Sequence, residues 1–171
     1  MRLICLRGFM SSQHKNLSEA EGSRLLNAAH YKFAIVWSEW NPDITKALCR
    51  GAHEVLIKYG AKPENIIEKA VPGSFELTMG AQFVAEKTKA DAIICIGCVI
   101  QGETRHFDFI CDAVAHGVTN VSLKYNKPVI FGVLTPNTLE QAQDRAGGKH
   151  GNKGDEAAVT ALKMIALKKG L

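Results

Sequence analysis

The sequence predicts an α/β protein, a three-layer αβα sandwich built on a four-stranded parallel sheet with helices on both faces. Short runs rich in Val and Ile alternate four times with segments of helical length and periodicity. The third run, 91–99, is apolar enough to be covered on both faces, as the central strand of a parallel sheet is. Strands that alternate with helices in this way form one sheet joined by right-handed crossovers.

The expected strands are apolar runs that end at a polar or glycine-containing turn. They span residues 32–38, 65–71, 91–99 and 128–134. The first helix is expected to have Asn41 as its N-cap and Pro42 at its first helical position, and to end at Gly60. The later helices are expected at 75–86, 107–124, 137–146 and 155–169, with a Gly- and Lys-rich loop at 147–154.

The domain organisation is simple: residues 31–171 form a single domain and residues 1–30 an N-terminal arm. A chain of 171 residues fits one domain, and no internal repeat, linker or low-complexity tract divides it. Within the arm, the spacing from Ser18 to Glu21 has the form of a capping box and predicts a short helix. Either Met1 or Met10 can be the first residue.

The charge and cysteine content argue against several classes of protein. The formal charge of +4 is mild and the basic residues are scattered, so no nucleic-acid partner is expected. No apolar run approaches the roughly 20 residues that cross a bilayer, so no membrane partner is expected. Five cysteines, several of them inside apolar runs, are typical of buried thiols in a reducing compartment, which predicts a cytoplasmic protein.

Cys95 and Cys98 have the CxxC spacing that metal and redox sites use. They fall within the third expected strand, where an offset of three places side chains on opposite faces. The pair therefore cannot bind one metal ion while the strand persists. Because no other His, Cys or Asp cluster has the spacing of a zinc or iron site, no metal site is predicted.

The turn over residues 97–106 is the strongest candidate site. Ligands of open α/β sheets bind outside the carboxyl ends of the strands, and helix N-termini attract anions. Glu103, Thr104 and His106 crowd this helix start. A lone histidine is often structural, but these neighbours favour a role in proton transfer. The turn is predicted to hold a phosphate and to transfer protons.

The other strands and the last loop carry further candidate binding residues. Trp40 follows the first strand, Ser74 and Glu76 follow the second, and Phe131 lies in the fourth. An aromatic side chain here suits stacking on a planar ring, but it equally suits core packing. Ser74 could also cap a helix, and Glu76 could balance a helix dipole. Arg145, beside a glycine pair, can clamp a phosphate or be an ordinary surface charge.

Four stretches, in the right order and spacing, resemble the 6,7-dimethyl-8-ribityllumazine synthase family of riboflavin biosynthesis. They are 71–76 (VPGSFE), 97–108 (GCVIQGETRHFD), 128–135 (PVIFGVLT) and 145–154 (RAGGKHGNKG). The resemblance implies a flavodoxin-like fold. It also implies a transferase that condenses 5-amino-6-(D-ribitylamino)uracil with 3,4-dihydroxy-2-butanone 4-phosphate. The implied products are 6,7-dimethyl-8-ribityllumazine, phosphate and water, and no metal or organic cofactor is implied.

The resemblance also implies a role for each candidate residue, with His106 as the proton-transfer residue. The residues implied to bind the pyrimidine and its ribityl chain are Trp40, Ser74, Phe75, Glu76, Cys98, Val99, Ile100 and, from the adjacent subunit, Phe131. Those implied to bind the phosphate of the four-carbon substrate are Glu103, Thr104 and Arg145. Trp40 departs from the family pattern, because many members have Phe there.

The implied partners, besides the small-molecule substrates, are further copies of this chain and, as a candidate, riboflavin synthase. Family members form pentamers, and some close into icosahedral shells of sixty subunits. The stretch 147–154 resembles the short form that shell-forming members have, so a shell is expected. The alternative function is a non-catalytic flavin- or pterin-binding, or purely shell-forming, member of the same fold.

Overall fold

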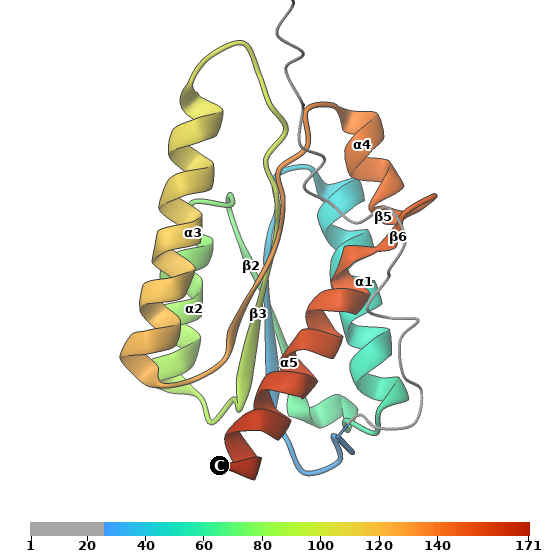
Figure 1. Cartoon of the computed structure of the whole chain (residues 1–171), viewed down its shortest axis with the longest axis vertical. Coiled ribbons are helices and arrows are strands. Elements are labelled where there is room, and N and C mark those ends of the chain that lie inside the picture. Colours follow the sequence, from blue (N-terminus) through green and yellow to red (C-terminus); the bar gives the residue numbers. More distant parts are fainter. Residues whose placement is uncertain (1–25) are drawn as a thin grey trace, which may run out of the picture.

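A computed structural model of the chain describes residues 26–171 (Figure 1). The capping box, both candidate first residues, Cys5 and all but the end of the predicted arm lie outside the described residues. In the described part of the chain, strands and helices alternate in the predicted order. No helix in that part has the length and apolarity that a membrane span requires.

In the described residues, the four main strands and the five α-helices agree with the prediction in number and kind. The main strands are β1 (Phe33–Ser38), β2 (Ile66–Val71), β3 (Ala92–Cys98) and β4 (Val129–Leu134). The α-helices are α1 (Pro42–Lys58), α2 (Leu77–Lys87), α3 (His106–Tyr125), α4 (Leu139–Asp144) and α5 (Lys153–Gly170). A 3₁₀ helix at Pro63–Asn65 and a short hairpin, β5 (Ala146–Gly148) with β6 (Gly151–Asn152), were not predicted.

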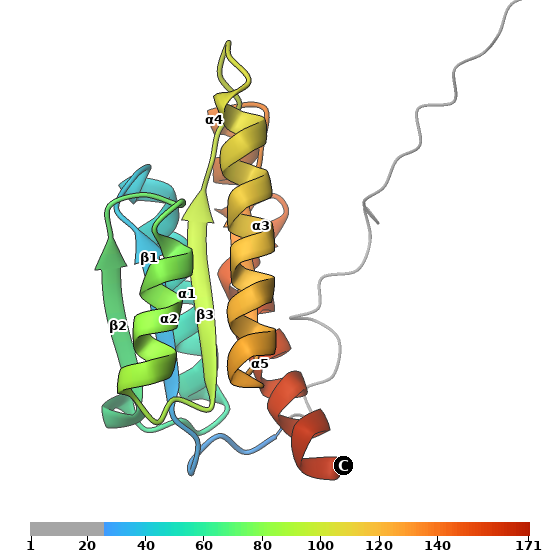
Figure 2. The same ribbon diagram turned by 90° about the vertical axis from the view of Figure 1, so that its left-hand side faces the viewer.

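The four main strands form one parallel sheet in the order β2-β1-β3-β4. Phe33 of β1 is opposite Ile66 of β2 on one side and Ala92 of β3 on the other. β3 is buried along its whole length. The prediction of a four-stranded parallel sheet whose third strand is covered on both faces is therefore confirmed. Because all strands run the same way, their carboxyl ends meet at one edge (Figure 2).

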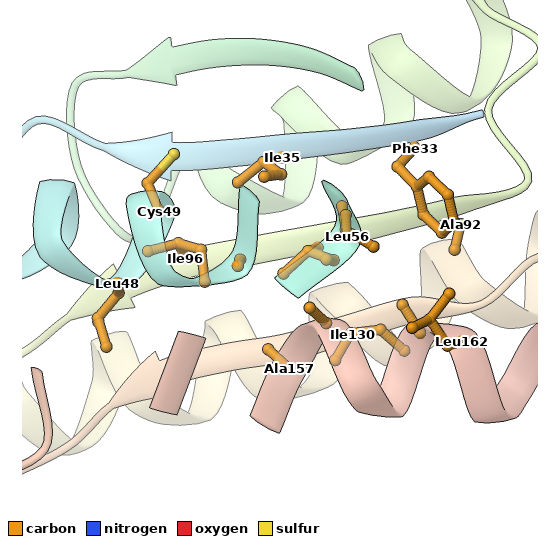
Figure 3. Close-up of a cluster of buried hydrophobic side chains, with 14 of the residues drawn as sticks. Phe33, Ile35, Leu48, Cys49, Leu56, Ala92, Ile96, Ile130, Ala157 and Leu162 are labelled. Atoms are coloured by element: carbon orange, nitrogen blue, oxygen red, sulfur yellow. The ribbon is translucent and has the colours of Figure 1, made fainter. Parts of the chain in front are cut away.

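Two apolar clusters fill the space between the sheet and its helices, α1 and α5 on one face, α2 and α3 on the other (Figure 1). Alternate residues of β1 enter opposite clusters, since successive strand side chains point to opposite faces. Phe33 and Ile35 belong to the cluster under α1 and α5, whereas Val36 belongs to the other. Figure 3 shows the first cluster, with Leu162 of α5 packed beneath the sheet. Each large buried side chain contributes about 1.5–3 kcal/mol.

Cys95 and Cys98 lie on opposite faces of β3, as predicted. Cys95 belongs to the cluster under α2 and α3, and Cys98 to the cluster under α1 and α5. Burial raises the pKa of the Cys95 thiol to about 12 and that of the Cys98 thiol to about 11. Both thiols therefore stay protonated at neutral pH and pack as small apolar groups.

Three predicted boundaries are wrong, and side-chain caps explain two of them. α4 starts at Leu139 because Thr138 Oγ1 accepts a hydrogen bond from the Gln141 N–H at 3.2 Å. α5 starts at Lys153, ahead of the expected position, because Asn152 Oδ1 accepts a hydrogen bond from a backbone N–H in the first turn. The predicted loop 147–154 therefore holds the β5–β6 hairpin and a helix start. The third boundary is the start of α2, which lies at Leu77.

α1 and α5 approach each other closely because glycines stand where the two helices meet. A Cβ on Gly154 would lie 1.9 Å from the backbone oxygen of Leu48 on α1. A Cβ on Gly51 would lie 2.3 Å from Asp155 Oδ1 on α5. Backbone atoms cannot move aside as a flexible side chain can, so the Gly154 contact is the stricter of the two.

Replacing Gly154 with alanine should therefore lower the free energy of unfolding by about 3 kcal/mol, the upper end of the cost of overpacking. Gly170→Ala is the matched control, because no atom lies within 4 Å of its Cβ position. It should change stability by no more than about 0.5 kcal/mol. Urea unfolding followed by circular dichroism, at one protein concentration, measures both. Equal midpoints for the two variants would contradict the packing argument.

Candidate active site

A pocket of about 630 Å³ lies at the carboxyl edge of the sheet and is here called the His106 pocket. It is lined by Trp40, Gly73, Ser74, Phe75, Glu76, Cys98, Val99, Ile100, Gly102, Thr104, His106, Phe107 and Ile110. These residues follow β1, β2 and β3 and begin α3. Three strand ends thus converge on one pocket, as the parallel sheet predicts.

The end of β1 is held to the end of β3 by Asn41. Its Nδ2 donates a hydrogen bond to the Cys98 backbone oxygen at 3.0 Å, across the sheet edge. Asn41 has a φ of 58°, the left-handed conformation that Asn tolerates better than most residues. Its side chain makes no capping bond to α1, so the predicted N-cap role is wrong in its chemistry although right in its position. This contact places Trp40 at the pocket mouth.

The turn after β2 presents Ser74, Phe75 and Glu76 to the same pocket. Ser74 is buried, and its Oγ has no hydrogen-bond partner among residues 26–171. It does not cap α2, which excludes the alternative that the sequence left open. Phe75 is 55% exposed and Trp40 is 72% exposed, so neither ring is a core residue. Large apolar rings left this open are typical of a surface that binds something.

The segment after β3 is fixed by main-chain hydrogen bonds to the end of β4. Val99 N–H donates to Leu134 O at 2.8 Å, and Gln101 N–H donates to Pro136 O at 3.0 Å. The Cys98 side chain is buried beneath the sheet, so residues 98–100 meet the pocket largely through a fixed backbone. Such a backbone offers hydrogen-bonding groups at constant positions.

His106 is the first residue of α3 and lies exposed at the pocket. The backbone N–H of His106 donates a hydrogen bond to Thr104 Oγ1 at 3.4 Å. This bond fixes the turn that leads into the helix. Thr104 lines the pocket, whereas Glu103 is exposed and is not among the lining residues. The first N–H groups of α3, with the positive end of its dipole, therefore lie close to Thr104 and favour an anion there.

Phe131 and Arg145 lie in a different pocket of about 740 Å³, here called the Arg145 pocket. It lies along β4 and α5 and shares no residue with the His106 pocket. Arg145 is half-buried, and its Nη1 donates to Gln141 O at 3.0 Å. Lys153, paired with Glu156 Oε1 at 2.6 Å, lines the same pocket. The described chain thus does not bring Arg145 and His106 together.

Residues 30–169 match the family described as 6,7-dimethyl-8-ribityllumazine synthase. The chain belongs to this family. A 6,7-dimethyl-8-ribityllumazine synthase of Cytophaga hutchinsonii is 63% identical over 157 residues, which are 92% of this chain and 98% of the relative. Another, of Parabacteroides distasonis, is 51% identical over 156 residues, 91% of this chain and 98% of that protein.

Membership of the 6,7-dimethyl-8-ribityllumazine synthase family confirms the resemblance drawn from the four sequence stretches. The four-stranded parallel α/β fold is likewise confirmed. The roles of individual residues stay predictions. In the described part of the chain, no group of three or more His, Cys, Asp or Glu side chains is arranged to hold a metal ion.

Four residues that line the His106 pocket were not predicted as site residues: Gly73, Gly102 and two with apolar side chains. Phe107 and Ile110 line the His106 pocket from the first turn of α3. Their spacing of three residues places them on one face of a helix that starts at His106, so helical periodicity could have found them. The bond from Asn41 to Cys98 could not have been found, since it joins residues 57 positions apart.

Asn41→Ala should destabilise the protein more than Asn41→Gly does. Both lose the hydrogen bond to Cys98, which costs about 1 kcal/mol. Only alanine also pays about 1–2 kcal/mol for the left-handed backbone, which glycine adopts freely. Urea unfolding of the two variants measures the difference. Equal destabilisation would show that the backbone at this position relaxes to an ordinary conformation.

Proposed function

We propose that the chain condenses 5-amino-6-(D-ribitylamino)uracil with 3,4-dihydroxy-2-butanone 4-phosphate to give 6,7-dimethyl-8-ribityllumazine, phosphate and water. The observation that carries the proposal is the His106 pocket, where eight residues implied by the resemblance to bind the pyrimidine or move protons line one space. The name of the relatives supports the same product. Formation of the lumazine from the two substrates, followed by its absorbance, tests it directly.

The pyrimidine and its ribityl chain fit the chemistry of the pocket entrance. Trp40 and Phe75 are exposed rings that can stack on a planar heterocycle. Ser74 has a buried hydroxyl with no hydrogen-bond partner among the described residues, and Glu76 is a carboxylate that can accept hydrogen bonds from a polyol. The backbone of residues 98–100 can pair with the polar edge of the ring. The substrate would therefore bind by stacking and by hydrogen bonds, with no metal ion required.

The phosphate of the second substrate is assigned to the start of α3. Thr104 and the first N–H groups of the helix favour an anion there. The Glu103 carboxylate would repel a phosphate, so its contribution is assigned to its backbone. Arg145 is suited to the same phosphate because its guanidinium forms paired hydrogen bonds with phosphate oxygens. Its place in the other pocket means that it must come from a neighbouring subunit.

A ring of subunits would bring the two pockets together. Met79 and Phe83 on α2, and Phe75 in the turn just before it, recur every four residues and are all about half exposed. β4, an edge strand, presents the exposed Phe131 beside the Arg145 pocket. These are two different surfaces, and a contact between different surfaces repeats head to tail and forms a ring when the rotation between neighbours closes. The pentamer implied by the family resemblance is such a ring.

The wider assembly and setting remain predictions. A shell of sixty subunits and an association with riboflavin synthase rest on the family resemblance. The cytoplasmic location rests on the use of cysteine. The alternative, a non-catalytic flavin- or pterin-binding or shell-forming protein, would retain the pocket but would release no phosphate from the two substrates.

In the proposed mechanism, holding the two substrates in contact supplies much of the rate. The amine of the pyrimidine attacks the ketone and an imine forms with loss of one water, phosphate leaves, and the ring closes with loss of a second water. Well-oriented reactants can gain about 7–11 kcal/mol of barrier from proximity. His106, at the pocket and exposed, is placed to take a proton from the attacking amine and return it to a departing group.

His106→Ala should therefore slow turnover by a factor of about 10² to 10⁴ without abolishing it, because proton transfer is lost and proximity remains. Lumazine absorbance under saturating substrates measures kcat, and light scattering checks that the assembly is intact. Complete loss of turnover in an intact assembly would contradict the proximity mechanism. Wild-type turnover would contradict the role assigned to His106.

A mixing experiment tests whether each site combines two subunits. His106→Ala and Arg145→Ala subunits, unfolded and reassembled together in equal amounts, should form complete sites at roughly one quarter of the contacts in a ring. Turnover should then rise well above that of either variant alone. The same two proteins mixed without reassembly are the control. If reassembly brings no gain, both residues act within one subunit and the shared site is wrong.

A further inference from the structure

A cavity of about 530 Å³, here called the lysine cavity, lies at the amino-terminal edge of the sheet. It is lined by Tyr31, Lys89, Ala90, Asp91, Tyr125, Asn126, Lys127, Ile165, Lys168 and Lys169. These residues precede β1, β3 and β4 or belong to the last turns of α3 and α5. Figure 2 shows this end of the molecule, near the C-terminus of α5, opposite the end where α3 starts. The cavity is thus separate from the candidate active site.

The lining is strongly positive, with four lysines and one aspartate. Asp91 Oδ2 already accepts a hydrogen bond from the Lys32 backbone N–H at 2.7 Å. Among residues 26–171, no carboxylate oxygen lies within 4.0 Å of Nζ in any of the four lysines. Charges that are scattered along the sequence are therefore gathered in space, and no carboxylate of residues 26–171 forms an ion pair with any of the four lysines.

Helix dipoles explain only half of this charge. Lys168 and Lys169 belong to the last turn of α5, where a positive side chain stabilises the helix end. Lys168 Nζ also donates to Asn126 O at 2.5 Å. Lys89 and Lys127 lie in the connections before β3 and β4, beyond the ends of α2 and α3. Each of these two lysines follows a helix C-cap, Thr88 of α2 and Asn126 of α3, and so lies outside the helix.

The floor of the cavity is apolar and aromatic. Ala90 and Ile165 are buried, and Tyr31 is half-buried with Lys169 Nζ 5.7 Å from its ring centre. Burial lowers the pKa of Lys127; Asp91 raises it and Lys168 lowers it further. An ammonium group held in this setting would gain from an anion that replaces the lost water.

We propose that the lysine cavity binds a small ligand that carries two or more phosphate groups. The four ammonium groups come from three separate segments around the cavity, more charge than one monoanion would need. The volume is that of an ordinary small-molecule site. A nucleic acid would instead need an extended basic track, and the sequence has none. The function proposed for the His106 pocket does not enter this inference.

Inorganic pyrophosphate is the test ligand, titrated calorimetrically into the full-length Arg145→Ala protein at low salt. This background removes Arg145 from the phosphate site proposed at the start of α3, and the cavity variants then show whether the remaining binding belongs to the lysine cavity. Adding Lys89→Gln and Lys127→Gln should weaken binding at least tenfold while leaving both helix ends intact. Adding Lys46→Gln and Lys69→Gln instead, two lysines outside the cavity with the same loss of charge, should change affinity less than twofold.

Thermal unfolding provides an independent readout. Pyrophosphate should raise the melting temperature of the Arg145→Ala protein, and the shift should disappear with Lys89→Gln and Lys127→Gln. Without ligand, these two substitutions should leave melting unchanged or raise it, because they relieve repulsion between lysines. Absence of pyrophosphate binding, binding lost in Arg145→Ala itself, or equal weakening by the two lysine pairs would each overturn the proposal.

Discussion

The candidate active site depends on the absence of a side chain at Gly97, where the turn before α2 crosses the end of β3. A Cβ on Gly97 would lie 2.7 Å from Ser74 Oγ and 2.9 Å from Leu77 Cδ1. It would also meet Val133 on the neighbouring strand at 3.3 Å. The turn from β2 therefore rests directly on the backbone of the central strand. Any larger residue would lift Ser74 away from the groups of β3 that face the same pocket.

The fold could be predicted from sequence because its information is local and repeated. β3 is apolar throughout and is buried throughout, so composition alone indicated that both of its faces are covered. The strand ends then followed from the parallel order, and with them the grouping of Trp40, Ser74 and His106 in one pocket. The roles assigned to those residues came from the family resemblance. Periodicity along the sequence does not distinguish a serine that binds a ligand from one that caps a helix.

The hydrogen bonds that could not be predicted are those for which a side chain can bond either to a neighbour in the sequence or to a distant residue. Asn41 stands before Pro42 in the pattern of a helix cap, but its amide bonds to a carbonyl on another strand. Asn152 lies in a glycine-rich run that was predicted to be a loop, yet its side chain caps α5. The helix therefore starts earlier than predicted, at Lys153. The glycines there permit the φ values of 114° at Gly147 and 70° at Gly151. A composition typical of loops thus permits a tight hairpin just as well.

The pocket residues also carry costs that a ligand would offset. A buried hydroxyl without a partner, as at Ser74, costs about 1–3 kcal/mol, and the exposed rings of Trp40 and Phe75 leave apolar area in water. Substrate binding would offset both costs. If the neighbouring subunit covers the same ligand through Phe131 and Arg145, the ligand and the subunit contact stabilise each other. By linkage, the free energy that the contact adds to substrate binding must equal the free energy that the substrate adds to the contact. In the proposed ring, the split of the site between two pockets therefore makes substrate binding a force that holds the assembly together.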